Sequence, residues 1–243
     1  MNTIVEESKI ETFQEKPTDF PLTQVNGAPL KPITQVLLDR RATPHFKPDA
    51  VPEEYLEAIL RFAAQAPSGY NLQPWRFIVV RDEANRHRLQ KAAMNQSKVG
   101  EAPVMIIAFA VKGEWKSRMD SIFEEGSRRG NGDAGTMAVQ KEAATNFLDA
   151  FPAAVWLNRH TMIALTTMML VAEAYGLDTA PMEGFDADAV KREFSLPLES
   201  EVIALLAIGF AKGPEKAYGG RLALRETVST EHYGWPWPGE QKY

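Results

Sequence analysis

The chain carries at residues 66–75 the stretch APSGYNLQPW, which is its most informative segment. Pro67 and Pro74 stiffen it, because proline fixes its own φ and restricts the residue before it. Gly69 lets the backbone approach a flat ligand closely. Hydrogen-bonding groups of both polarities come from Ser68, Asn71 and Gln73. The stretch favours a loop that holds a heterocycle with carbonyl and imide edges; the alternative is an ordinary polar loop, with Trp75 packed in the core.

Helical periodicity precedes this loop, and helices alternate unevenly with apolar runs after it. Pro52 suits a first helical position, and apolar side chains recur at helical spacing from there to Ala66. A shorter helix is expected at 33–41, ended by Pro44. Beyond the loop we expect strands at 77–80, 104–111 and 201–210, helices at 83–94, 137–150, 153–175 and 186–194, and a turn at 181–185. Helices outnumber strands and no βαβ repeat is present, which predicts an α+β fold.

The expected helix at 153–175 is apolar on nearly every side, which predicts a position in the centre of the fold. Gly176 is its expected C-terminal stop. His160, near its start, is expected to be a buried or half-buried side chain with a hydrogen-bond partner rather than a ligand. The four histidines are too far apart for a helical metal pair and no HExxH motif exists, so we expect no metal site.

One domain is expected over residues 33–228. Residues 1–32 hold four prolines and little periodicity, which predicts an extended N-terminal arm that embraces a second subunit. Residues 113–135 mix charges, aromatic side chains and glycines with weak periodicity, which predicts a mobile surface loop, a kind of segment that sometimes serves as a lid. The C-terminal tail, residues 229–243, contains an aromatic cluster.

Composition excludes several classes of function. No cysteine is present, which excludes disulfides, iron–sulfur clusters and cysteine nucleophiles and favours a reducing compartment. Lys and Arg number 27 against 32 Asp and Glu, and the net charge of −5 argues against an indiscriminate polyanion binder. The first 32 residues do not read as a signal peptide, and the longest apolar run, 104–111, is too short to span a membrane. We therefore expect a cytoplasmic protein that binds neither nucleic acid nor membrane.

Two further segments carry groups suited to a ligand. Arg40 and Arg41 close a short helix, and adjacent guanidiniums are good bidentate partners for phosphate; the alternative is a solvated helix end. The stretch PMEG at 181–184 follows the expected central helix. There the backbone N–H of Glu183 or Gly184 could face a ligand, although an ordinary connecting turn would explain the stretch when it is taken alone.

In this order and spacing, the three segments resemble the nitroreductase family of FMN-dependent oxidoreductases, over about residues 33–228. The stretch at 67–75 matches the family's P-S-x-x-N-x-Q-P-W and is the most specific part of the resemblance. AP at 102–103, AYGL at 174–177 and PMEGFD at 181–186 also match. Several independent matches in one order are much harder to obtain by chance than a single match.

The resemblance implies an α+β homodimer whose subunits wrap around each other, each with a central antiparallel or mixed sheet flanked by helices, and with two FMN molecules at the interface. The cofactor carries the redox step in such proteins, so no side chain is expected to be catalytic. The implied FMN-binding residues are Arg40, Arg41, Ala42 and Arg221 at the phosphate and ribityl end, Pro67, Ser68, Gly69 and Asn71 from the partner subunit, and Pro181, Met182, Glu183 and Gly184, with a backbone N–H of 183–184 at flavin N5.

The sequence departs from the family where cations are usual. The family often has R-R-S-x-[RK] where this chain has RRATP at 40–44, so Ala42 and Pro44 replace the serine and the second cation. Gly219 stands in place of the lysine of a K-x-R. A positive charge near flavin N1 and O2 stabilises the reduced anion, so its loss is expected to lower the potential unless another cation substitutes. Lys98 is a candidate substitute; the alternative is a solvated lysine before a strand.

The function that the resemblance implies is hydride transfer from NADH or NADPH, through flavin N5, to a flat electrophile such as a nitroaromatic or a quinone. Ping-pong kinetics are expected because donor and acceptor use one cavity in turn. Trp115, Met119 and Phe123 could stack on an aromatic acceptor or pack the 113–135 segment onto the body. The alternatives are a flavoenzyme of the same fold with other chemistry (dehydrogenation, dehalogenation, ring cleavage or flavin reduction) and a protein that binds FMN without turnover.

Overall fold

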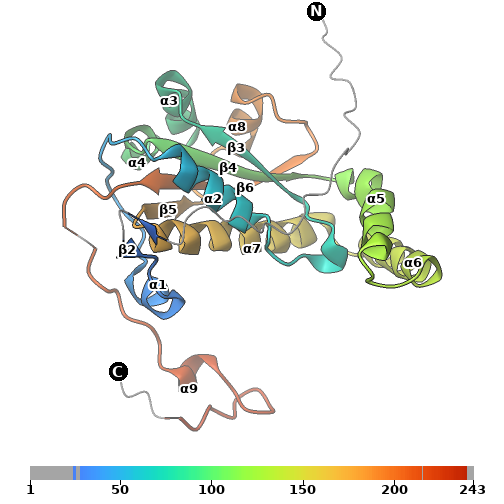
Figure 1. The fold of residues 1–243 in the computed structure, drawn as a ribbon. Helices are drawn as coiled ribbons and strands as arrows, with labels where there is room; N and C mark the ends of the chain where they lie inside the picture. Colours follow the sequence, from blue (N-terminus) through green and yellow to red (C-terminus); the bar gives the residue numbers. More distant parts are fainter. Residues whose placement is uncertain (1–23, 26–27, 215, 240–243) are drawn as a thin grey trace, which may run out of the picture.

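The computed structural model describes residues 24–25, 28–214 and 216–239 (Figure 1). Its strands are β1 (Gln24–Val25), β2 (Ala28–Pro29), β3 (Trp75–Val80), β4 (Val104–Val111), β5 (Asp178–Met182) and β6 (Ser200–Gly209). Its helices are α1 (Ile33–Asp39), α2 (Glu53–Ala63), α3 (Glu83–Ala92), α4 (Ser97–Glu101), α5 (Glu114–Arg128), α6 (Ala134–Ala150), α7 (Ala153–Ala174), α8 (Ala187–Glu193) and α9 (Leu224–Thr227), with a 3₁₀ turn at Gly69–Asn71. None of these helices combines the length and apolar character needed to cross a bilayer.

Four antiparallel strands form the central sheet, in the order β3-β4-β6-β5. β4 and β6 lie in the middle, where Ile106 pairs with Leu206. Both strands are rich in apolar side chains because helices cover them on both faces, so neither face meets water. The predicted strand at 104–111 and the predicted fold class, α+β with an antiparallel sheet flanked by helices, are confirmed.

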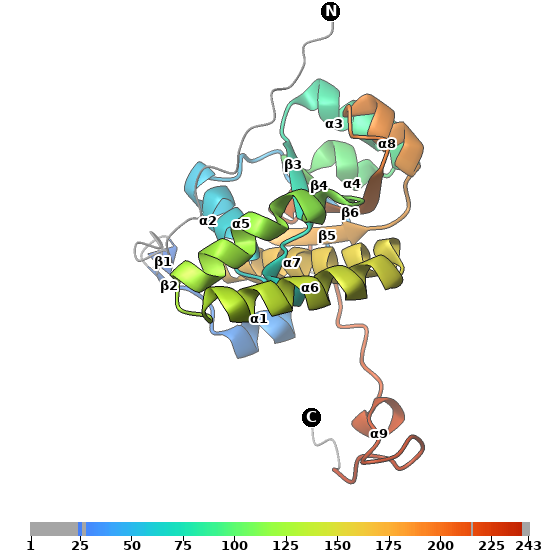
Figure 2. The same ribbon diagram turned by 90° about the vertical axis from the view of Figure 1, so that its right-hand side faces the viewer.

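The helices form two layers around this sheet. α2 and α7 cover one face, and α3, α4 and α8 cover the other (Figures 1 and 2). Successive side chains of a strand point to opposite faces, so β4 contributes to two separate cores. Ile106 and Ala108 face the core under α7, whereas Met105 and Ile107 face the core under α3 and α8.

α7 contacts all four strands of the sheet, which confirms the central position predicted for it. The helix ends in the hydrogen-bond pattern of a glycine stop: Gly176, with φ +74°, donates to the Glu173 carbonyl, and Leu177 donates to the Ala172 carbonyl at 2.9 Å. Its other side is not fully covered within one chain, because Val155 and Ile163 are 41% and 39% exposed.

The prediction of a surface loop at 113–135 is wrong. Residues 114–128 form helix α5, and α6 begins at Ala134. Four apolar side chains on α5 are buried at the helical spacing i, i+4, i+7 and i+8, a pattern that the intervening charges obscure: Trp115, Met119, Ile122 and Phe123. These side chains pack α5 onto the body, which is one of the two alternatives stated for Trp115, Met119 and Phe123. A contact with an acceptor stays a prediction.

The prediction of a turn at 181–185 is wrong in its first half. Pro181 and Met182 complete β5 and pair with Leu206 and Leu205. β5 is an edge strand of the sheet, where a proline can be accommodated because one side of the strand needs no ladder partner. The turn is confined to the residues after Met182, where Phe185 donates to the Glu183 carbonyl.

The predicted N-terminal arm lies largely outside the described residues. Within the described part, Lys31 pairs with Glu173 of α7 at 2.6 Å. Burial lowers the pKa of Lys31, but hydrogen bonds and attraction from Glu173 and Asp39 outweigh it and raise the pKa overall. At the other end, the segment that carries α9 projects away from the body (Figures 1 and 2), and Tyr233, Trp235 and Trp237 are exposed on it.

We expect Gly209→Ala to lower the free energy of unfolding by about 1–3 kcal/mol. A Cβ at Gly209, the last residue of β6, would lie 2.6 Å from Cδ of Pro103 and 3.1 Å from Cδ1 of Phe46. The proline ring is tied to the backbone and the Phe46 ring is buried, so neither can swing away. Urea unfolding measures the change. Gly219→Ala is the matched control, because nothing lies within 4 Å of a Cβ there. An unchanged unfolding midpoint for Gly209→Ala would contradict this packing.

Candidate functional site

The loop at 67–75 is held in a strained shape by its own hydrogen bonds. Ser68 Oγ accepts from the amide of Gln73 at 3.0 Å, and the Gly69 carbonyl accepts from the amide of Leu72 at 3.1 Å. Three non-glycine residues of the loop have positive φ: Tyr70, Asn71 and Gln73. Backbone strain of this kind clusters at functional sites, because the surrounding structure must enforce it. The loop at 67–75 therefore has one defined conformation, held by its own hydrogen bonds, as a ligand-binding loop would need.

Gly69 places this loop against the first half of α7. A Cβ on Gly69 would lie 3.2 Å from Nε1 of Trp156 and 3.3 Å from Nε2 of His160, so glycine is needed for the close approach. His160 is half-buried, and its Nδ1 lies 2.8 Å from the carbonyl oxygen of Trp156, which gives it the partner predicted for it. Trp75 is buried in the core, as the second interpretation of the stretch predicted.

Arg76 ties the end of the loop to the start of α5. Its guanidinium lies 3.0 Å from Glu114 and donates to the carbonyls of Gln73 and Trp75. Burial lowers the pKa of Arg76, and the neighbouring Glu114 carboxylate opposes that effect. The guanidinium nevertheless stays charged at neutral pH, because arginine titrates far above it. The shape of the loop and the position of α5 are therefore linked.

The arginine end of the candidate site forms where three segments meet. The amide of Thr43 donates to the Thr179 carbonyl at 2.9 Å, and Ala42 bridges to the same residue of β5. Asp178 accepts from Thr43 Oγ1 at 3.2 Å and from the amide of Ala211 at 2.8 Å. One carboxylate therefore joins the chain after α1, the first residue of β5 and the chain after β6.

Arg41 and Arg221 lie around one exposed aromatic ring, that of Tyr218. Within residues 24–25, 28–214 and 216–239, neither of them nor Arg40 forms an ion pair. The neighbouring carboxylate, Asp39, is engaged by Gln35 and Lys31; the hydrogen bond from Gln35 is the largest cause that lowers its pKa. Asp39, Glu173 and Asp178 line the same hollow as Arg41, and the charge of Arg41 helps to lower the pKa of Asp39. In the described residues, however, none of these carboxylates forms an ion pair with either of the two predicted phosphate-binding guanidiniums.

The far end of β5 presents two backbone donors. In the described part of the chain, no protein acceptor pairs with the amide N–H of Glu183 or Gly184, and both residues are exposed. Gln96 donates from Nε2 to the Gly184 carbonyl at 2.8 Å and so fixes this segment. Lys98, half-buried on α4, lies two residues beyond Gln96. The predicted residues 183–184 and 98 are thus parts of one corner of the fold.

The sequence analysis missed the segment before α4. Met94 and Asn95 both have φ of +55°, and with the three residues of the 67–75 loop they make up most of the described non-glycine residues with positive φ. Sδ of Met94 would lie 3.8 Å from a Cβ on Gly184. The available signal was the Asn-Gln pair after a helix, since asparagine tolerates the left-handed region better than most residues.

The predicted site residues fall into two groups at opposite ends of α7. Gly69 lies against Trp156, whereas Arg41 and Glu173 line one small hollow. Trp156 and Glu173 are separated by roughly 26 Å along the helix axis, at 1.5 Å of rise per residue. One chain therefore places Arg41 beside the start of β5, Glu183 and Gly184 at its end, and Arg221 at the Tyr218 ring next to Arg41. It does not bring Pro67, Ser68, Gly69 and Asn71 to them.

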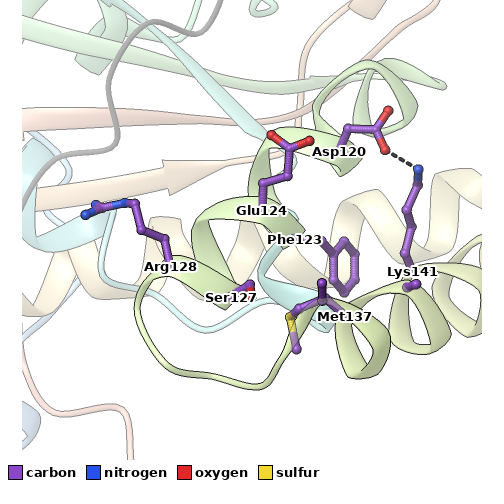
Figure 3. Close-up of a pocket in the computed structure, with 9 residues that line it drawn as sticks. Asp120, Phe123, Glu124, Ser127, Arg128, Met137 and Lys141 are labelled. Atoms are coloured by element: carbon purple, nitrogen blue, oxygen red, sulfur yellow. Dashed lines mark hydrogen bonds and ion pairs between the residues drawn. The ribbon is translucent and has the colours of Figure 1, made fainter.

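A separate hollow of about 410 Å³ lies between α5 and α6 (Figure 3). Phe123 and Met137 face it from the two helices, and an ion pair between Asp120 and Lys141 stands at its edge (Figure 3). None of the residues assigned to the cofactor lines this hollow. It is therefore distinct from both groups of the candidate site.

The fold is α+β, and within one chain the predicted site residues lie in two separate groups. Comparison with known proteins gives the particular family. The model of the nitroreductase family matches residues 37–210. The chain belongs to the nitroreductase family.

Individual relatives agree with this assignment. The chain is 36% identical over 192 residues to the "NADH dehydrogenase" of Thermus thermophilus, a match that covers 79% of this chain and 92% of that protein. It is 31% identical over 203 residues to YdgI of Bacillus subtilis, provisionally named an NAD(P)H nitroreductase, with 80% and 95% covered. A crystal structure of an Exiguobacterium sibiricum protein in complex with FMN has the same fold, with a TM-score of 0.75 at 24% identity over 83% of this chain and 98% of that one.

Proposed function

We propose that two copies of this chain bind FMN between them and use NADH or NADPH to reduce a flat electrophile such as a nitroaromatic or a quinone. The observation that carries the proposal is the pair of guanidiniums, Arg41 and Arg221, gathered at the ring of Tyr218 without an ion-pair partner in the described residues. FMN is bound by a protein of the same fold, and reduced nicotinamides appear in the names of relatives. Bound FMN would supply the redox chemistry, accepting hydride from the nicotinamide and passing electrons to the acceptor.

Arg40, Arg41 and Arg221 would bind the phosphate end of FMN. Guanidiniums bind phosphate through paired, charge-assisted hydrogen bonds, which are stronger than neutral ones. The backbone beside Arg41 is fixed because Thr43 donates to Thr179, so this part of the site is organised before a ligand arrives. Binding to a site that is already organised costs less conformational entropy.

The backbone of Glu183 and Gly184 would bind the flavin ring of FMN. Their unpaired N–H groups can donate to a ring nitrogen or carbonyl, and Gln96 holds the segment through the Gly184 carbonyl. β5 joins this end to the arginine end and spans roughly 13 Å between its first and last residues. That separation suits a ligand with a phosphate at one end and a flat heterocycle at the other.

A second copy of the chain would complete the site. Apolar side chains are exposed on α1 and on the outward side of α7: Ile33, Leu37, Leu38, Val155 and Ile163. A contiguous exposed apolar face is the usual mark of a protein interface. If two α7 helices packed antiparallel through this face, the 67–71 loop of one copy would approach the β5 residues of the other. The projecting C-terminal segment, with its exposed aromatic side chains, would supply further contacts.

Gly219→Lys is expected to raise the midpoint potential of bound FMN. The side chain fits, because nothing lies within 4 Å of a Cβ at this position. A cation at this end of the site attracts the reduced, anionic flavin more than the oxidised, neutral one, and each kcal/mol of that preference corresponds to roughly 20 mV for a two-electron couple. Redox titration against a reference dye measures the shift. Leu198→Lys, on a remote exposed side chain, is the control; equal shifts in both variants would contradict a local effect.

The experiment that tests the proposed function is an absorption spectrum of purified protein after incubation with FMN and removal of the excess. We expect retained absorbance at about 450 nm, a general property of flavins, that bleaches under anaerobic conditions with NADH or NADPH. Adding a quinone or a nitroaromatic should then restore it. Protein that retains no flavin would contradict FMN binding, and flavin that neither nicotinamide bleaches would contradict the reductase activity.

A further inference from the structure

Tyr218 brings together two arginines that are far apart in the sequence. Cζ of Arg41 lies 4.8 Å from the centroid of the Tyr218 ring, and Cζ of Arg221 lies 5.5 Å from it. Both distances are within the range of a cation–π contact. Tyr218 is exposed, so burial in the core does not explain its position. The Tyr218 ring therefore contacts two guanidiniums and is not part of the core.

Both guanidiniums keep donors available for a ligand. Arg41 donates from Nη1 to the Arg40 carbonyl at 2.9 Å, and Arg221 donates from Nη1 to the Gly220 carbonyl at 2.6 Å. A guanidinium has five N–H donors, so each retains several after this bond. Two like charges beside one ring repel each other, and an anion bound by both would remove that cost.

The sequence between the ring and the second arginine explains how they meet. Gly220 has φ +77°, which is in the left-handed region, and it turns the chain between Tyr218 and Arg221. Gly219, which precedes Gly220, adds no side chain to this turn.

We propose that Tyr218 is a positioning residue for the phosphate group of FMN: its ring holds the guanidiniums of Arg41 and Arg221 together so that both donate to the same phosphate. This inference rests on the proposed function. The inference leads to a specific prediction, because the Tyr218 ring would act only through the two arginines. Loss of the ring must weaken the binding of FMN and leave the binding of riboflavin, which lacks the phosphate, unchanged.

Titration of the apoprotein with FMN and with riboflavin, followed by flavin fluorescence, tests the inference. We expect Tyr218→Leu to weaken FMN binding about tenfold, because the two arginine side chains would then have to be ordered when FMN binds, with riboflavin binding unchanged. Tyr218→Phe keeps the ring and should bind FMN like the unaltered protein. Leu198→Ala, at an exposed side chain outside the C-terminal segment and outside the candidate site, is the control.

The ligand-free protein provides a second readout. The ring current of Tyr218 should shift the Nε–Hε resonances of Arg41 and Arg221 in NMR spectra, and the shift should persist in Tyr218→Phe and disappear in Tyr218→Leu. Equal FMN affinity for Tyr218→Leu and the unaltered protein would overturn the inference and leave the proposed function standing. Equal losses of FMN and riboflavin would also overturn it. Failure of the unaltered protein to bind FMN would overturn both.

Discussion

Apoprotein carrying Arg221→Ala is expected to bind FMN about 10- to 100-fold more weakly than the unaltered protein. A hydrogen bond to a charged group contributes about 1.5–3 kcal/mol, and tenfold in affinity corresponds to about 1.4 kcal/mol. Arg221 has no ion-pair partner in the described residues, so its removal strands no carboxylate and the loss is confined to the ligand. Flavin fluorescence during titration of the apoprotein measures the change.

Lys98→Ala is the comparison for this prediction. Lys98 lies at the ring end, on α4, where a single ammonium makes point contacts rather than paired ones. We therefore expect a smaller loss of FMN affinity than for Arg221→Ala. Equal losses in the two variants, or no loss with Arg221→Ala, would contradict the assignment of Arg221 to the phosphate.

Ile163→Glu is expected to convert the protein from a dimer to a monomer and to abolish FMN retention. Ile163 lies at the middle of α7 on its outward side, 39% exposed within one chain. In a symmetric pair, the substitution would place two carboxylates in one apolar interface, and unpaired buried charges cost several kcal/mol each. Light scattering gives the mass in solution, and absorbance of the same fractions gives the retained flavin.

Leu198→Glu is the matched control for Ile163→Glu. Leu198 is 86% exposed in the loop between α8 and β6, away from α7, and the substitution makes the same change of side chain. It should leave both the mass and the flavin content unchanged. Monomeric Ile163→Glu protein that retains FMN at full affinity would show that one chain holds the cofactor alone.

The sequence was sufficient to predict helices and strands that are buried on all sides, because they are apolar along their whole length. β4 is apolar at every position because both faces are covered, and its bounds were predicted without error. α7 was equally clear, since an all-round apolar helix ended by Gly176 has few other interpretations. The motif at 67–75 identified the family because prolines, a glycine and amides at fixed spacing rarely coincide.

α5 could not be predicted for a physical reason. Its four buried side chains, spread over residues 115–123, are separated by a lysine, an arginine, an aspartate and two serines, and glycines follow the helix. A short amphipathic stripe against that background has the composition of a loop. The turn predicted at residues 181–182 was wrong for another reason. Proline is usual in turns, and only the edge position of β5 makes it acceptable in a strand.

The division of the candidate site could not be predicted from residue types alone. Arg41 and Gly69 are close in sequence, yet α7 separates their surroundings by most of its length. The role of Tyr218 was equally hidden, because a ring that joins residues 41 and 221 leaves no local pattern. Such relations depend on tertiary placement, which the motifs themselves do not encode.

A mixed dimer tests directly whether FMN is held between two chains. One chain would carry Arg41→Ala and Arg221→Ala, the other Gly69→Val, whose added side chain would press on Trp156 and displace the loop. Different affinity tags allow purification of dimers that contain one of each. At an FMN concentration where neither parent homodimer binds, the shared site predicts one FMN per mixed dimer, because one of its two sites receives only unaltered residues. Mixed dimers that bind no FMN would contradict it.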